Sequence, residues 1–223
     1  MNRITLLLLA LVFLVSDASA QPVRGYGLKI GVTRAIWDWN INGRPMEPLG
    51  PRVGLDAAFF AEWLNLDVVS IVSEVHYIQK GIQQDIPITT ASAPDGTGSF
   101  VHERVRLDYL SIGILPKCRL DCGMAEYYLI GGIRFDISLG GNATAEADAP
   151  FNDLVLGSYQ TFIDRFKEFQ LGATVGIGAQ LHALLPWSTG IEFRYSPNLQ
   201  RAYSAQYADV TNTSFELLLT LSF

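Results

Sequence analysis

The chain has 223 residues, 49% of them hydrophobic, and a formal net charge of −6. It contains no block of basic residues, which argues against nucleic acid as a partner. Beyond the first twenty residues, no segment approaches the roughly 18 uninterrupted apolar residues of a transmembrane helix. The length suits one all-β domain. A membrane location stays open, because a closed barrel also satisfies every backbone group.

The first twenty residues predict a signal peptide. A short basic start, Met1-Asn2-Arg3, precedes an apolar run over residues 4–15 that is too short to span a bilayer comfortably. Ala18 and Ala20 form the small-residue pattern of a cleavage site. We expect cleavage between Ala20 and Gln21, with residues 21–223 forming the exported domain. The residue directly after the cut is Gln21 and not a cysteine, which disfavours a lipid anchor.

Eight segments then alternate apolar and polar residues, as strands with one apolar face do. They occupy residues 26–36, 52–63, 66–80, 101–115, 126–140, 169–182, 188–196 and 213–223. The connections after the second, fourth and sixth segments are short, whereas the others are long and polar. This pattern predicts an all-β fold, an eight-stranded antiparallel up-and-down transmembrane β-barrel with short periplasmic turns and long extracellular loops.

Alternation alone would also fit a soluble calyx of the lipocalin type, in which the apolar face surrounds a ligand. Two features favour a lipid-facing apolar side. The polar face combines glycines with charged residues, which suits a narrow interior. Five aromatic residues of outward parity lie at the short-turn ends, and we predict that they form an interfacial girdle: Tyr26, Trp63, Tyr127, Trp187 and Phe223.

The polar face carries charges that we expect inside the barrel: Glu62, Glu74, Lys80, Arg104, Arg106, Asp108, Arg134, Asp136, Glu168, Glu192, Arg194 and Glu216. They could line an ion path or form a salt-bridged plug. Eight strands leave an interior barely wide enough for side chains, which favours the plug. In residues 101–115 the apolar phase slips after Tyr109, which indicates either a bulge or a locally apolar interior.

The chain ends on a strand whose outward residues are all apolar: Phe215, Leu217, Leu219, Leu221 and Phe223. This ending resembles the C-terminal assembly signal of outer-membrane barrels, which the barrel-assembly machinery reads.

The mature chain as a whole resembles the PorT-like outer-membrane β-barrel family, small porin-superfamily proteins of the OmpA/OmpX-like eight-stranded type. The resemblance is most specific in "DYLSIGILPK" (residues 108–117), and "YYLIGGIRFDISLG" and "FQLGATVGIGAQL" support it. Ser111 and Gly113 replace an acidic residue and a proline of the family pattern. The resemblance implies an integral barrel of the bacterial outer membrane.

Three histidines, His76, His102 and His182, share the inward parity. A membrane-embedded enzyme would need one of them beside a nucleophile and a carboxylate. No nucleophile elbow or spaced set of metal ligands accompanies them. We therefore expect hydrogen-bonded interior histidines, with no catalysis, cofactor or metal.

Cys118 and Cys122 are the only cysteines and fall on a predicted periplasmic turn. Because that compartment is oxidising, we expect a local disulfide between them. Metal binding by two thiols and a redox-active pair are weaker alternatives.

The sequence thus predicts an outer-membrane barrel without catalysis that acts through its exposed loops, in envelope integrity, adhesion or secretion assembly. The partners expected are the lipid bilayer, the barrel-assembly machinery and other envelope proteins. The alternatives are a narrow channel for small solutes, a lipid-modifying membrane enzyme and a soluble carrier.

Overall fold

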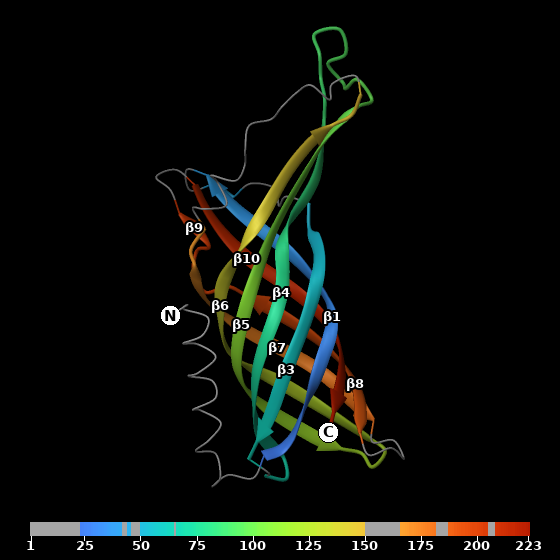
Figure 1. Cartoon of the computed structure of the whole chain (residues 1–223), viewed down its shortest axis with the longest axis vertical. Helices are drawn as coiled ribbons and strands as arrows, with labels where there is room; N and C mark the ends of the chain where they lie inside the picture. The colour runs from blue at the N-terminus through green and yellow to red at the C-terminus, as the bar shows by residue number, and fades with distance from the viewer. Residues whose placement is uncertain are drawn as a thin grey trace, which may run out of the picture.

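The fold is described from a computed structural model, which covers residues 23–41, 44–45, 50–64, 66–149, 166–181, 187–204 and 208–223. The predicted signal peptide, the predicted cleavage site at Ala20 and Gln21, and His182 lie outside these residues. In the part described there are eight long strands and two short ones (Figure 1). The long strands are β1 (Val23–Ile41), β3 (Arg52–Trp63), β4 (Val69–Pro87), β5 (Phe100–Asp121), β6 (Ala125–Ala147), β7 (Phe169–Leu181), β8 (Ser188–Pro197) and β10 (Ala208–Ser222).

The eight long strands form one closed antiparallel ring. Each pairs with the next along the chain, and β10 returns to pair with β1 from Gly27↔Ser222 to Ile41↔Ala208. At one end of this ring, the short strand β2 (Arg44–Pro45) pairs with β1, and the short strand β9 (Tyr203–Ser204) pairs with β10. The predicted eight-stranded up-and-down barrel is therefore confirmed.

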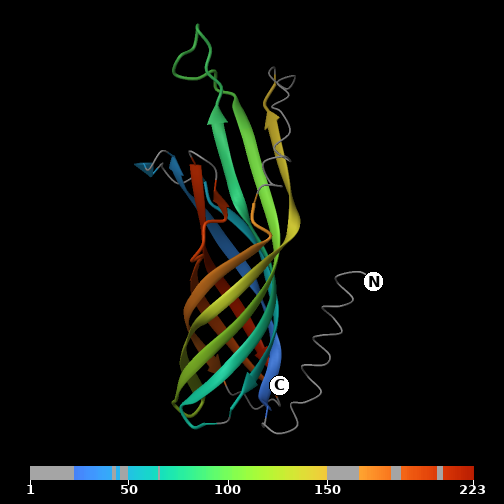
Figure 2. The same ribbon diagram turned by 90° about the vertical axis from the view of Figure 1, so that its left-hand side faces the viewer.

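The two ends of the barrel differ. At the end where the C-terminus lies, β3 and β5 are followed by connections of only a few residues, 64–68 and 122–124. At the opposite end, β4, β5 and β6 rise well past the other strands (Figure 2). There β6 pairs with β5 as far as Ala147 but with β7 only as far as Ile137. A three-stranded sheet, β4–β5–β6, thus stands above the barrel rim.

No helix among the described residues is long and apolar enough to cross a membrane.

The alternation of the strands sorts side chains by polarity between the two faces. On β7, Thr174 is buried in the interior, whereas its neighbours Val175 and Ile177 point outward and are 56% and 58% exposed. The other long strands follow the same rule over the lower part of the barrel. A broad apolar surface therefore faces outward and needs lipid to cover it.

Replacing Val175 or Ile177 with Arg should destabilise the folded barrel by about 2–4 kcal/mol near the bilayer midplane, because the charge would face hydrocarbon. Thr174→Ser, on the inward side of the same strand, is the matched control and should change stability little. Urea titrations of folding into lipid vesicles measure both. Equal sensitivity of the two faces would contradict the assignment of inside and outside.

Candidate functional site

The centre of the barrel holds a compact cluster of charged side chains. The Arg194 guanidinium donates to both carboxylate oxygens of Glu74, at 2.6 and 2.8 Å, and also contacts Glu192. Lys29 Nζ lies 2.6 Å from Glu74 and 2.9 Å from Glu192. The His76 ring joins the cluster through contacts with Glu74 (2.9 Å) and Asp56 (2.7 Å). The cluster therefore links β1, β3, β4 and β8 across the lumen.

Two further clusters lie on either side of the central one. Toward the raised sheet, Arg134 contacts Glu216 at 2.9 Å and Asp136 at 3.0 Å, and Lys80 contacts Asp136 at 2.8 Å. At the short-turn end, the Glu62 carboxylate forms ion pairs with three basic residues, and Glu126 forms ion pairs with two of the same three. The basic residues are Arg24, Lys117 and Arg119.

The three clusters balance in charge. Their carboxylates are Asp56, Glu62, Glu74, Glu126, Asp136, Glu192 and Glu216. Their basic residues are Arg24, Lys29, Lys80, Lys117, Arg119, Arg134 and Arg194. Seven carboxylates thus face seven permanent cations. Since an unpaired charge in a narrow lumen is strongly destabilising, this balance is what an interior filled with ion pairs requires.

An apolar layer closes the lumen toward the raised sheet. Trp37, Leu107 and Tyr109 are completely buried there and pack with other apolar side chains from β4, β5, β9, β10 and the segments before β7 and β9. These are Ile78, Ile82, Val105, Phe166, Ala202, Tyr203 and Val210. The inward residues of β4 include Glu74 and His76 in the centre and Ile78 and Ile82 in the cap, with Lys80 buried between the two isoleucines.

Little free volume remains in the lower lumen. The Tyr128 ring occupies the space beside Gly178, where a Cβ atom would lie only 2.3 Å from a ring carbon. The Tyr128 hydroxyl then donates to Glu192 at 2.7 Å. The cavity between Lys29, Phe60 and Tyr128 encloses about 10 Å³, room for about one water molecule. In the part of the chain described, the interior is thus a packed core.

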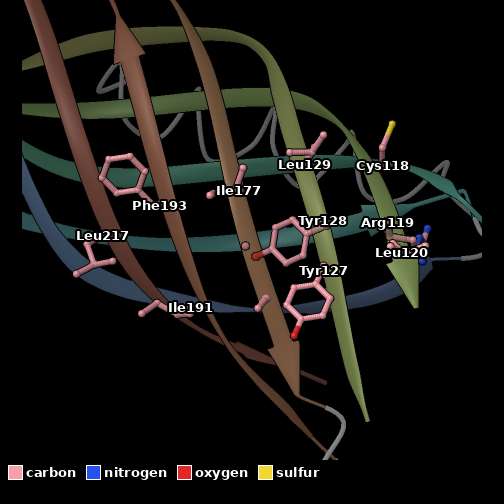
Figure 3. Close-up of a pocket in the computed structure, with 12 residues that line it drawn as sticks. Cys118, Arg119, Leu120, Tyr127, Tyr128, Leu129, Ile177, Ile191, Phe193 and Leu217 are labelled. Atoms are coloured by element: carbon pink, nitrogen blue, oxygen red, sulfur yellow. The ribbon is translucent and has the colours of Figure 1, made fainter. Parts of the chain in front are cut away.

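The outer face carries an apolar groove of about 660 Å³ near the short-turn end (Figure 3). Its walls come from Tyr127 and Leu129 on β6, Phe193 on β8 and Leu217 on β10, and small Ala179 lies on its floor. The lining is almost wholly apolar and holds no constellation of catalytic groups. In a bilayer this groove suits an acyl chain.

Six of the residues predicted for the interior charge network lie there: Glu74, Arg134, Asp136, Glu192, Arg194 and Glu216. Glu62 and Lys80, also expected inside, are buried as well.

The expectation was wrong for Arg104, Arg106, Asp108 and Glu168. On β5 the odd-numbered residues point inward over the whole strand, so Arg104 and Arg106 are exposed and Asp108 is half-buried on the outer side. The apparent slip of phase after Tyr109 is therefore an apolar interior, formed by Val105, Leu107 and Tyr109. Glu168 is exposed and precedes β7.

The sequence prediction omits Lys117 and Arg119 because its strand ends at residue 115, and it places Glu126 on the polar face of the next segment without counting it among the interior charges. The odd-numbered inward positions continue past Pro116 to Arg119, and following them would have identified both cations.

The predicted disulfide is also wrong, because Cys118 and Cys122 are free and exposed. Cys118 lies within β5, which continues to Asp121, so it is not on the turn. Extended chain from Cys118 to Asp121 already spans about 10 Å. The Cα atoms of a disulfide lie at most about 7 Å apart.

The histidines differ from each other in environment. His76 is buried as expected, whereas His102 is on the raised sheet and partly exposed. Its ring nitrogens contact Asp85 at 2.6 Å and Asp148 at 3.2 Å, and these hydrogen bonds raise the pKa of His102. His102 thus ties β4 and β5 to the end of β6. Among the described residues no group of three or more His, Cys, Asp or Glu could hold a metal ion.

The five residues predicted for the girdle all lie at the short-turn ends of their strands. Tyr26 and Phe223 are 53% and 48% exposed, and their ring centroids are 6.1 Å apart. Tyr127 on β6 and Trp187 before β8 are also exposed, and Trp63 ends β3. That this row sits at a bilayer interface stays a prediction.

Arg194→Leu should destabilise the barrel by about 3–5 kcal/mol, because Glu74 and Glu192 would keep only Lys29 as a permanent cation in contact with them in the lumen. Arg201→Leu removes an exposed arginine paired with Asp209 and should change stability by less than about 1 kcal/mol. Urea unfolding of the two variants in the same lipid measures the difference. Similar small effects would argue against a tightly coupled interior.

Solved structures of similar shape are bacterial outer-membrane proteins. The chain resembles Ail, the attachment invasion locus protein of Yersinia pestis, at 9% identity and a TM-score of 0.41, covering 89% of this chain and 98% of that one. Neisserial surface protein A is 13% identical, with a TM-score of 0.43, and the match covers 87% of this chain and 95% of that one. OprG from Pseudomonas aeruginosa is 9% identical, with a TM-score of 0.43, and the match covers 89% of this chain and 95% of that one. Comparison with curated protein sequences found no match.

A family model described as the outer membrane protein beta-barrel domain matches residues 20–203. This match covers most of the chain and agrees with the closed ring of eight long strands and the outward apolar surface. It also fixes the location of the protein as the bacterial outer membrane. The chain belongs to the family of outer membrane proteins with this beta-barrel domain.

Proposed function

We propose that the protein is a non-catalytic interaction module of the outer membrane, which binds other envelope or surface components through its raised end. One observation carries the proposal. The lumen is filled by ion pairs and closed by an apolar cap, while the β4–β5–β6 sheet rises beyond the rim. Because the lumen is filled, we expect the protein to act through the exposed end of the barrel.

The raised sheet has the features of a binding element. It is held together by regular pairing of β5 with both neighbours and by the His102 contacts to Asp85 and Asp148. Beyond Ser138, no described strand pairs with the outer edge of β6. Unpaired strand edges accept an additional strand from a partner, with main-chain hydrogen bonds supplying affinity. Adhesion, envelope integrity and secretion assembly are the roles that such an element would serve.

The PorT-like resemblance belongs to the same proposal. It rests chiefly on residues 108–117, in the middle of β5, and is supported by "YYLIGGIRFDISLG" on β6, "FQLGATVGIGAQL" on β7 and the C-terminal strand. A narrow channel is the alternative, and no observation favours a membrane enzyme or a soluble carrier.

A bilayer experiment and a capture experiment test the proposal together. Purified protein in planar bilayers should give no discrete, stable openings, because ion pairs fill the described lumen and an apolar cap closes it. Tagged protein cross-linked in intact cells should capture envelope components. A variant whose hairpin tip, residues 88–99, is replaced by a two-residue turn should lose them.

A variant with Lys167→Gln and Arg201→Gln, two exposed changes near the rim outside the raised sheet, is the control for the capture. Regular single-channel steps, or capture that does not depend on the hairpin, would refute the proposal.

We also propose that the C-terminal strand is read by the barrel-assembly machinery. In support, Phe215 to Phe223 form the strand that must pair with β1 before the barrel can close. The backbone of Phe223 exchanges hydrogen bonds with Tyr26, at 2.8 and 3.3 Å.

Deleting Phe223 removes one half-exposed ring, so the truncated chain should still refold in detergent. In cells it should assemble poorly and accumulate unfolded in the periplasm. Fractionation and heat-modifiable gel mobility measure both. Normal amounts in the outer membrane would mean that this ending is a strand without a signal function.

A further inference from the structure

Two exposed arginines lie on the outer side of the barrel where its apolar surface ends, and the side chain of a third, half-buried arginine lies near them. On β5, Arg104 and Arg106 are exposed and follow Asp108 toward the raised end, whereas outward Ile114, lower on the strand, is apolar and 51% exposed. On β3, Arg52 is half-buried and has the inward parity of Asp56, whereas the adjacent Val53 points outward and is 62% exposed. The arginines therefore lie at the level where acyl chains give way to headgroups on the long-loop side.

Gly81 brings Arg52 next to the two arginines of β5. Gly81 is the cross-strand partner of Arg106 on β4. Its φ of 143° is one that other residues rarely adopt. A Cβ atom on Gly81 would lie 3.1 Å from Cδ of Arg52, so the missing side chain leaves the path of the Arg52 stem open. Arg104, Arg106 and Asp108 are the charged groups that act electrostatically on Arg52.

In the part of the chain described, the positive charge of this cluster is only partly paired. Asp108 lies 3.4 Å from Arg106 Nε, and Asp85 and Glu146, the cross-strand partners of His102, lie diagonally across from Arg104. Within the described residues Arg52 and Arg104 form no ion pair, and the buried Nε of Arg52 has no hydrogen-bond partner. The interior clusters pair their cations with carboxylates, whereas the described part of the outer face leaves these arginines largely without acidic partners.

We infer that Arg104 and Arg106, with the Arg52 side chain beside them, form a binding site for the phosphate group of a membrane lipid in the outer leaflet. Guanidinium groups bind phosphate oxygens through paired, charge-assisted hydrogen bonds. The apolar surface below, including Val53 and Ile114, contacts the acyl chains of the same lipid. The site thus recognises a phosphate and an acyl chain together, which a free anion does not supply.

Native mass spectrometry of the full-length protein, released from nanodiscs that contain phosphatidic acid, tests the site. The double variant Arg104→Gln/Arg106→Gln should bind phosphatidic acid at least about tenfold more weakly than the wild type. Diacylglycerol, which has the same chains without the phosphate, should bind both proteins equally weakly. Inorganic phosphate at millimolar concentration should not displace the lipid.

Two further variants separate the site from general charge effects and from misfolding. Lys167→Gln/Arg201→Gln removes the same charge from exposed positions elsewhere near the rim and should bind like the wild type. Arg104→Lys/Arg106→Lys keeps the charge without the planar fork and should recover part of the affinity. Equal retention of phosphatidic acid by the wild type and the Gln variant would overturn the site. Displacement by inorganic phosphate would overturn its assignment to a lipid.

Discussion

The closure of the sheet between β1 and β10 is the constraint on which the rest of the structure depends. Lipid hydrocarbon offers no hydrogen-bond partner, so a sheet that crosses it must leave no edge unpaired. The pairing from Gly27↔Ser222 upward meets that requirement. It also fixes the number of strands around the ring at eight, and this number in turn fixes how much room the lumen has.

A lumen of that width has to be filled, and the side chains that fill it explain its chemistry. Alternation sends every second residue of a strand inward, and a lipid-facing strand places its polar residues there. Those polar residues are stable only if they satisfy each other, as Glu74 does with Lys29, His76 and Arg194. Contacts of this kind tie strands that are distant in sequence and hold the register of the ring.

The asymmetry of the two rims follows from what each side of the membrane demands. The C-terminal end needs only to turn the chain around, so its described connections are short and its aromatic side chains point outward. The other end carries the long connections, the raised β4–β5–β6 sheet and the outward arginines. Edge strands and unbalanced charges are tolerated there because water and headgroups are within reach.

Residues that alternate cleanly were predictable from the sequence. The outward positions of β7 and β10 and the inward Glu192, Arg194 and Glu216 follow from parity alone, because one face of each strand is wholly apolar. On β5 most apolar residues face inward in the upper half of the strand and outward in the lower half. The alternation of polarity therefore does not tell which face of β5 is inside. Arg104 and Arg106 were assigned inward on the assumption that charges always occupy the lumen.

The sequence by itself determined that this chain is an eight-stranded barrel with an apolar outside, because period-two alternation and the lengths of the connections are local properties. Only the tertiary structure decided which charges meet, that the upper lumen is apolar, and that Cys118 lies too far along an extended strand to bridge to Cys122. Those outcomes depend on the register between strands and on where each strand ends. A register is fixed by contacts among all eight strands at once, and no single segment contains it.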